Sequence, residues 1–197
     1  MEETTLRIGC ILMAAGNSRR FGSNKLSVTF DGLTMAEHVL NVIPSEIFSS
    51  VVVVTQYPEI AEMARSRGFV VKINQEPEKG LSNTIRIGIE ALLDMDALLF
   101  LVADQPMLRQ ETIQNVVALY RAHPDRIVIA GHEGRRGNPC IFPREFNEEL
   151  LALTGDMGGV VVIKAHEDRI LCYHVEDVRE LIDIDTEHTL SELMRTP

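Results

Sequence analysis

Short apolar runs alternate with longer segments of helical periodicity along the first two thirds of the chain. Five runs rich in Val, Ile and Leu predict buried strands: residues 7–14, 51–55, 70–73, 98–102 and 127–130. Their nearly continuous apolarity is typical of parallel strands that are covered on both faces. Four intervening segments predict helices: residues 35–42, 58–67, 81–93 and 111–122. This alternation predicts an α/β fold, a three-layer αβα sandwich around a Rossmann-like, mostly parallel sheet.

The alternation becomes less regular after Gly131. The Gly- and Arg-rich stretch 134–139 predicts a loop, followed by a short strand at 140–142 and a helix from Arg144. We then expect a helix at 156–165, a strand at 170–174, an extended segment at 181–184 and a last helix at 187–195. The length of 197 residues, without an internal repeat or linker, predicts a single domain over residues 1–197.

The composition argues against several classes of protein. The chain has 19 basic and 29 acidic residues, a net charge of -10, whereas a general nucleic-acid binder needs a basic surface. The longest wholly apolar run, 97–103, is far below the roughly 18 residues of a membrane helix, and no basic leader precedes an apolar segment. Cys10, Cys140 and Cys172 lack zinc-type spacing. We therefore expect a cytoplasmic protein with reduced thiols that binds neither nucleic acid nor membrane.

The loops after the first and fourth predicted strands are where we expect a ligand, because open α/β sheets bind ligands beyond the carboxyl ends of their strands. In the first loop, small residues and three cations in seven positions are suited to bind an anion, although a plain polar surface loop is an alternative. Gly16 and Gly22 do not fit a G-x-G-x-x-G motif, and Lys25 comes three residues after Gly22, too late for a Walker A motif. A Rossmann dehydrogenase and a P-loop NTPase are therefore disfavoured.

Five segments, in one order along nearly the whole chain, carry a resemblance to a known family. Residues 12–25 follow L-A-A-G-x-S-x-R-x-G-x-x-K, with Met13 in place of Ala. Residues 80–88 are similar to G-x-S-x-S-L-x-x-G, 102–106 to G-D-Q-P, 137–142 to G-N-P-V-L-F, and 183–186 to D-I-D-T-P. The chain thus resembles the molybdenum cofactor cytidylyltransferases of the MobA-like NTP transferase superfamily, which implies a fold of the nucleotidyltransferase type.

This resemblance implies transfer of CMP from CTP to molybdenum-bound molybdopterin, giving molybdopterin cytosine dinucleotide and pyrophosphate. It implies a Mg²⁺-dependent enzyme with Lys25, Arg19 and Asp104 as catalytic residues, in which Arg19 and Lys25 hold the triphosphate and Asp104 and Asp185 bind the metal. No covalent enzyme intermediate is required, because positioning and charge neutralisation lower the barrier. Mg²⁺ needs few protein carboxylates and keeps several waters and substrate phosphates.

The nucleotide-binding residues that the resemblance implies are Ala14, Ala15, Gly16, Arg19, Lys25 and Ser82. Ala15 and Ser82 favour CTP, because the related guanylyltransferases carry L-A-G-G in the first loop and lack the segment that contains Ser82. Both metal candidates have a structural alternative. Asp104 is suited to cap the following helix, and Asp-Thr before the last helix is also a capping signal, in which case Asp183 would be the second ligand instead of Asp185.

The acceptor site is where the chain departs from the family. The motif G-D-x-G-A-R appears as G-D-M-G-G-V at residues 155–160, so Val160 replaces the Arg that would contact a pterin phosphate or the enzyme's own acidic residues. Either Arg135, Arg136 or Lys164 substitutes for that cation, or the acceptor differs.

Several functional alternatives therefore stay open. One is nucleotidyl transfer to another phosphorylated small molecule, and another is GTP-dependent guanylyl transfer to molybdopterin. A third is a non-catalytic accessory protein that binds the cofactor or a molybdenum hydroxylase. Retention of Lys25, Asp104 and Asp185 disfavours the accessory protein. Members of the family that this chain resembles deliver the finished cofactor to molybdenum hydroxylases. Such a hydroxylase is therefore the expected protein partner.

Overall fold

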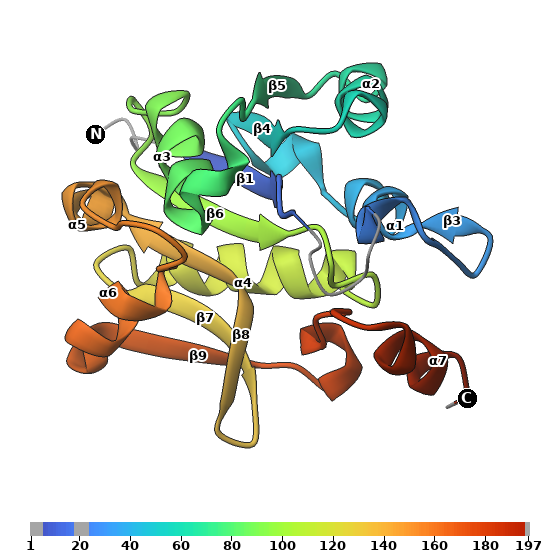
Figure 1. Ribbon diagram of the computed structural model, residues 1–197. Helices are drawn as coiled ribbons and strands as arrows, with labels where there is room; N and C mark the ends of the chain where they lie inside the picture. Colours follow the sequence, from blue (N-terminus) through green and yellow to red (C-terminus); the bar gives the residue numbers. More distant parts are fainter. Residues whose placement is uncertain (1–5, 18–23, 196–197) are drawn as a thin grey trace.

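A seven-stranded sheet forms the centre of the molecule (Figure 1). The computed structural model describes residues 6–17 and 24–195. Along the sheet, the strands are β5 (Val70–Ile73), β4 (Ser50–Thr55), β1 (Ile8–Ala14), β6 (Ala97–Val102), β8 (Arg135–Pro143), β7 (Ile127–His132) and β9 (Ile170–His174). Neighbouring strands are parallel except where β8 pairs with β6 and β7. The predicted α/β class and mostly parallel sheet are confirmed.

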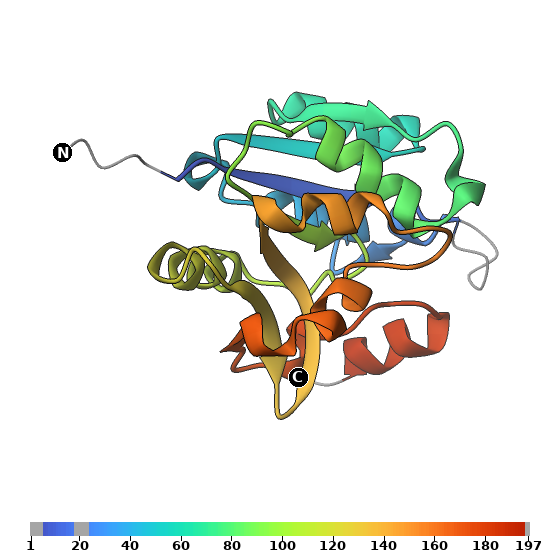
Figure 2. The same cartoon turned by 90° about the vertical axis from the view of Figure 1, so that its left-hand side faces the viewer.

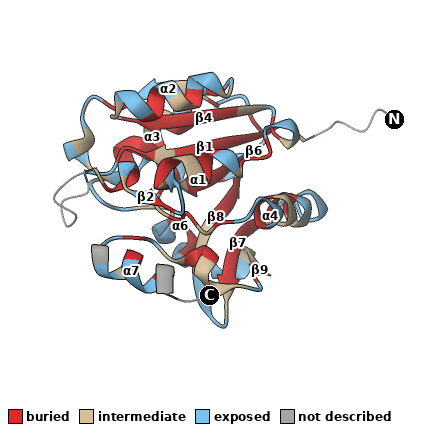
Figure 3. Ribbon diagram, turned by 90° about the vertical axis from the view of Figure 1, so that its right-hand side faces the viewer, coloured by how far each residue is buried: buried red, intermediate tan, exposed pale blue. Residues whose placement is uncertain are grey.

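Helices cover both faces of this sheet, which confirms the three layers (Figure 2). One face packs against α1 (Met35–Asn41), α2 (Pro58–Ser66) and α4 (Gln110–Ala122). The other packs against α3 (Leu81–Glu90), α5 (Asn147–Leu151) and α6 (Val160–Ala165). Successive residues of β1 serve the two cores in turn, with Cys10 and Leu12 in the first and Ile11 in the second. Figure 3 shows the central strands as the most buried part of the fold.

A third, smaller hydrophobic core joins the last helix of the chain to an early hairpin. The hairpin of β2 (Thr29–Phe30) and β3 (Leu33–Thr34) and the start of α1 provide Phe30 and Met35. Helix α7 (Glu187–Arg195) and the segment before it provide Ile184, Leu190 and Leu193. This packing brings residues 183–185 to the carboxyl edge of the sheet, where the Ile184 N–H donates to the Asp104 carbonyl at 2.9 Å.

Short 3₁₀ turns connect several of these elements, among them η1 (Lys25–Ser27), η3 (Pro77–Lys79) and η6 (Val178–Leu181). The others are η2 (Ser45–Ile47), η4 (Arg144–Phe146) and η5 (Glu167–Arg169). Within the described part of the chain, the helices are all too short or too polar to cross a membrane.

The loop predicted at 134–139 is wrong, because most of this stretch belongs to β8. Glu133 and Gly134 both have positive φ (46° and 83°), the geometry of a tight hairpin turn between β7 and β8. Arg135 and Arg136 therefore pair with His132 and Gly131 through their backbones.

Three smaller expectations are also corrected. The 70–73 strand lies at the edge of the sheet, where Val70 and Ile73 are 46% and 45% exposed, rather than buried on both faces. The helix predicted at 156–165 begins only at Val160, since the glycine-rich residues before it form a turn. The segment predicted as extended at 181–184 begins with Leu181 in η6, because Asp177 caps that turn through the Arg179 N–H.

Candidate active site

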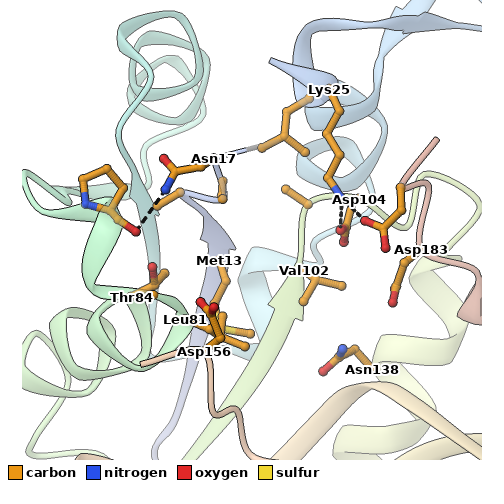
Figure 4. Close-up of a pocket in the computed structure, with 18 of the residues that line it drawn as sticks. Met13, Asn17, Lys25, Leu81, Thr84, Val102, Asp104, Asn138, Asp156 and Asp183 are labelled. Carbon is orange, nitrogen blue, oxygen red and sulfur yellow. Dashed lines mark hydrogen bonds and ion pairs between the residues drawn. The ribbon is translucent and has the colours of Figure 1, made fainter. Parts of the chain in front are cut away.

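A cavity of about 740 Å³ lies beyond the carboxyl ends of β1 and β6 (Figure 4), where the sequence predicts a ligand. Its walls are the loop after β1, the end of β6, the start of α3 and the segment before α7. The predicted site residues that line it are Ala14, Ala15, Gly16, Lys25, Asp104 and Asp185. Arg19 lies outside the described residues.

Ser82 is placed behind the cavity wall rather than on it. Its side chain is buried (3% exposed), and its N–H donates to the Gly155 carbonyl at 3.0 Å. Its neighbours Gly80, Leu81 and Thr84 line the cavity instead. The 80–88 segment thus reaches the site through residues on either side of Ser82.

Lys25 lies between two carboxylates that come from distant parts of the chain. Its Nζ donates to Asp104 Oδ2 at 2.6 Å and to Asp185 Oδ1 at 2.7 Å, and the residue is only 9% exposed. Burial lowers the pKa of this ammonium, but the charges and hydrogen bonds of Asp104 and Asp185 outweigh it and leave the pKa raised. Lys25 is therefore a charged group held at a fixed point of the cavity.

Local hydrogen bonds explain how Lys25 is placed. It begins η1, and the Asn24 side chain before it accepts from the Leu26 N–H at 3.1 Å. The Asn24 amide also donates to Glu59 of α2 at 3.0 Å, which ties the end of the first loop to a helix of the scaffold.

Neither Asp104 nor Asp185 caps a helix, in contrast to the alternative raised by the sequence. Arg109, not Asp104, occupies the N-cap of α4. At α7, the Thr186 hydroxyl accepts from the Thr189 N–H at 3.1 Å, so the threonine rather than Asp185 caps this helix. Both carboxylates are thus directed into the cavity by the elements that precede and follow them.

Asp183 is a third carboxylate at the same end of the cavity (Figure 4). Gln105 donates to its Oδ1 at 2.8 Å. Partial loss of hydration, followed by the like charge of Asp104, raises the pKa of Asp183. Asp183 and Asp185 therefore differ in their partners, since a neutral amide binds one and the Lys25 ammonium binds the other.

The charges around the cavity are strongly unequal. Among the described residues that line it, Lys25 is the one basic side chain. The acidic ones are Glu78, Asp104, Asp156, Asp183 and Asp185. A polyphosphate that enters this cavity therefore needs further cations to offset the repulsion.

The candidate residues for a divalent cation fit that role. Among the described residues, no group of three or more His, Cys, Asp or Glu is arranged to hold a metal. Mg²⁺, however, is commonly bound by one or two carboxylates together with substrate phosphates. Asp104 and Asp185 offer hard oxygens around one point, and Asp104 Oδ1 is buried with no hydrogen-bond partner in the described chain.

None of the residues considered as substitutes for the missing family Arg lines the cavity as far as the structure describes its walls. Arg136 is engaged elsewhere, in a two-point ion pair with Glu167 at 2.7 and 2.6 Å. Val160, at the start of α6, is 54% exposed and also lies outside the cavity wall.

Sequence analysis missed Thr55, the last residue of β4, and Gln56 and Tyr57 after it, which donate hydrogen bonds to the end of β1 and the loop that follows. Their one available signal was position, because three consecutive polar side chains end a strand that pairs with β1. Contacts from side chains to backbone carbonyls leave no pattern in the sequence.

Comparison with known proteins agrees with this architecture. Purine catabolism protein PucB of Bacillus subtilis is 26% identical over 188 residues, covering 89% of this chain and 90% of that protein. The crystal structure of Rv0371c from Mycobacterium tuberculosis H37Rv superposes with a TM-score of 0.80 at 21% identity, over 98% of this chain and 100% of that one. A further structure of Rv0371c, with a TM-score of 0.75, is a complex with manganese.

Molybdopterin-guanine dinucleotide biosynthesis protein A from Archaeoglobus fulgidus has a similar fold, with a TM-score of 0.68 at 17% identity over 93% of this chain and 95% of that one. Residues 10–170 match the family described as MobA-like NTP transferase domain. The chain therefore belongs to the MobA-like NTP transferase family and is a nucleotidyltransferase of that family.

Proposed function

We propose that this protein is a Mg²⁺-dependent cytidylyltransferase that transfers CMP from CTP to molybdenum-bound molybdopterin. The observation that carries the proposal is the pair of contacts that the Lys25 ammonium makes with Asp104 and Asp185, at 2.6 and 2.7 Å. These contacts lie beside the loop after β1. An ammonium between two carboxylates, in a cavity rich in negative charge, is suited to a substrate that arrives as a metal–triphosphate complex.

In the proposed reaction, an acceptor phosphate oxygen forms a bond to the α-phosphorus of CTP. The bond from that phosphorus to the oxygen bridging to the β-phosphate breaks, and pyrophosphate leaves with the electron pair. Asp104 and Asp185 would hold Mg²⁺, which offsets charge on the phosphate oxygens when it is bound. Lys25 would place a second positive charge beside the same oxygens, and Arg19 would bind the leaving phosphates.

The preference for CTP rests on Ala15 and on the 80–88 segment, as the family resemblance implies. Gly80, Leu81 and Thr84 line the cavity together with the loop after β1, which supports a nucleoside position between these two walls. We expect kcat/KM for CTP to exceed that for GTP at least tenfold, on the order of 1.4 kcal/mol. Equal rates, or a preference for GTP, would leave the nucleotidyltransferase assignment intact and overturn the choice of base.

A second candidate is transfer to a different phosphorylated small molecule. It is favoured by Val160 in place of the family Arg and by Lys25 being the one basic side chain in the described cavity wall. A molybdenum hydroxylase is the proposed protein partner, and the name of PucB, a purine catabolism protein, is compatible with such an enzyme. We propose a cytoplasmic site of action, in keeping with the three free cysteines.

One assay separates these readings. Pyrophosphate release is measured from CTP, GTP, UTP and ATP without an acceptor, with molybdenum-bound molybdopterin and with other phosphorylated small molecules. Each measurement is made in Mg²⁺ and again in excess EDTA. Release that requires CTP, the pterin and Mg²⁺ is the expected result. Release that does not depend on the pterin but requires another phosphorylated acceptor favours the second candidate. No release with any acceptor, in a protein that binds the cofactor, identifies an accessory protein.

A further inference from the structure

Three consecutive side chains at the end of β4 hold three consecutive carbonyls of the loop after β1. The hydroxyl of Thr55, the amide of Gln56 and the hydroxyl of Tyr57 are the donors. Their distances to the carbonyl oxygens of Ala14, Ala15 and Gly16 are 2.9, 2.9 and 2.6 Å, respectively. Each donor residue therefore binds one carbonyl, and the three pairs follow the same order along both segments.

This register is not that of a strand. In an extended strand, successive carbonyls point to opposite sides, but here three successive carbonyls all accept from side chains at the end of β4. Since C=O and N–H lie on opposite sides of a planar trans peptide, the N–H groups of Ala15, Gly16 and Asn17 point away from these donors. All three residues line the cavity. Their N–H groups are therefore available to bind an anion there.

Further hydrogen bonds hold this arrangement from both ends. The Gln56 amide also donates to Asn17 Oδ1 at 3.0 Å, and the Asn17 amide donates to the Pro77 carbonyl at 3.2 Å, across to the wall that precedes α3 (Figure 4). At the other end, Thr55 is fully buried and its hydroxyl accepts from the Tyr57 N–H at 3.0 Å. Residues 14–17 are thus held in place before any ligand arrives.

We propose that Thr55, Gln56 and Tyr57 are positioning residues that orient the N–H groups of the loop toward the phosphates of the nucleotide. They act through the carbonyls they bind, without touching the nucleotide. The identity of the anion as a nucleoside triphosphate rests on the proposed function. The orientation of these N–H groups does not, because they would bind phosphate groups whatever those are attached to.

The test uses Tyr57→Phe and Gln56→Met, which remove the donors and nearly keep the side-chain volumes. Affinities for inorganic tripolyphosphate and for CTP, each with Mg²⁺, are measured by calorimetry on the full chain. We expect each variant to bind both ligands about three- to tenfold more weakly, and the double variant to lose more than either. Tyr173→Phe is the matched control, because it removes a hydroxyl partner of Asn115 (2.9 Å) on β9 and should change neither affinity.

Steady-state kinetics supply the second readout. Because the N–H groups bind phosphate in both ground state and transition state, KM for the nucleotide should rise more than kcat falls. A purely structural role would instead lower the thermal midpoint and leave the affinity of the folded protein unchanged. Unchanged tripolyphosphate affinity in Tyr57→Phe and in Gln56→Met overturns the proposal, as does a wild-type protein that binds neither ligand. Wild-type protein that binds tripolyphosphate but transfers no nucleotide overturns the proposed function and leaves the positioning role standing.

Discussion

The Lys25 ammonium donates a 2.6 Å hydrogen bond to Asp104, joining the loop after β1 to the end of β6. With the 2.7 Å contact to Asp185, it forms a three-membered charge cluster that holds one positive and two negative charges. The ammonium thereby occupies the space between the two carboxylates that are the candidate metal ligands. A divalent cation must compete with it for the same oxygens.

Lys25→Ala should lower kcat for nucleotidyl transfer about 10²-fold or more, with a smaller rise in KM for CTP. The reason is that charge on the phosphoryl oxygens is redistributed in the transition state, where a fixed ammonium stabilises it. Initial rates over a range of CTP concentrations give both constants. Lys79→Ala, which removes a surface ammonium paired with Glu76 at 2.7 Å, is the control. A change in KM alone would show that Lys25 only holds the nucleotide.

The same variant should bind Mn²⁺ more tightly when no nucleotide is present. Removing a cation from between Asp104 and Asp185 takes away the positive charge that contacts both carboxylates among the described residues, and we expect affinity to rise about tenfold or more. Electron paramagnetic resonance of free Mn²⁺ measures this without any turnover. Asp104→Asn added to Lys25→Ala should reverse the gain. Equal Mn²⁺ affinity in wild type and Lys25→Ala would mean that the metal binds elsewhere.

Asp104→Asn should abolish transfer, a loss of about 10²-fold or more, while the protein stays folded and binds nucleotide weakly. The amide keeps the shape of the carboxylate but is a poor ligand for Mg²⁺, and Asp104 neither caps α4 nor packs in a core. Activity and circular dichroism are measured on one preparation, with Asp94→Asn, at an exposed pair with Arg7, as the control. Normal turnover would refute the metal role, and unfolding would point to a structural one.

Gly80→Ala should destabilise the protein by about 2–4 kcal/mol, more than Gly68→Ala, for which we expect about 1–2 kcal/mol. Both glycines have positive φ, +87° and +78°, and Gly80 combines it with a ψ of −172°, a region open essentially only to glycine. A Cβ on Gly80 would also lie 2.5 Å from the backbone of Gly155, whereas one on Gly68 meets nothing within 4 Å. Urea unfolding of both variants measures the difference. Equal losses would show that neither the close contact with Gly155 nor the ψ of Gly80 adds to the cost.

The sequence predicts the sheet and half of the site for a clear physical reason. Apolar strand runs and the rule that ligands bind beyond strand ends locate Lys25 and Asp104, because Lys25 lies in the loop after β1 and Asp104 comes just after β6. Asp185 reaches the site instead because Phe30 and Met35 form a core with one side of α7. No local sequence pattern encodes that contact. The strand predicted at 140–142 lies within β8, but its first part was missed because Arg135 and Arg136 join the sheet through backbone pairing and carry no apolar alternation.

The third core cluster also sets the order in which the site is completed during synthesis. Lys25 and Asp104 are made early, and β1 and β6 are able to pair as soon as residue 102 has emerged. Asp185 reaches Lys25 only after Leu190 and Leu193 pack against Phe30, some 160 residues later in the chain than Lys25 itself. A growing chain is therefore able to pair β1 with β6 before Asp185 has been made. Capture of an ion at the proposed metal site would accordingly wait until the last helix has docked.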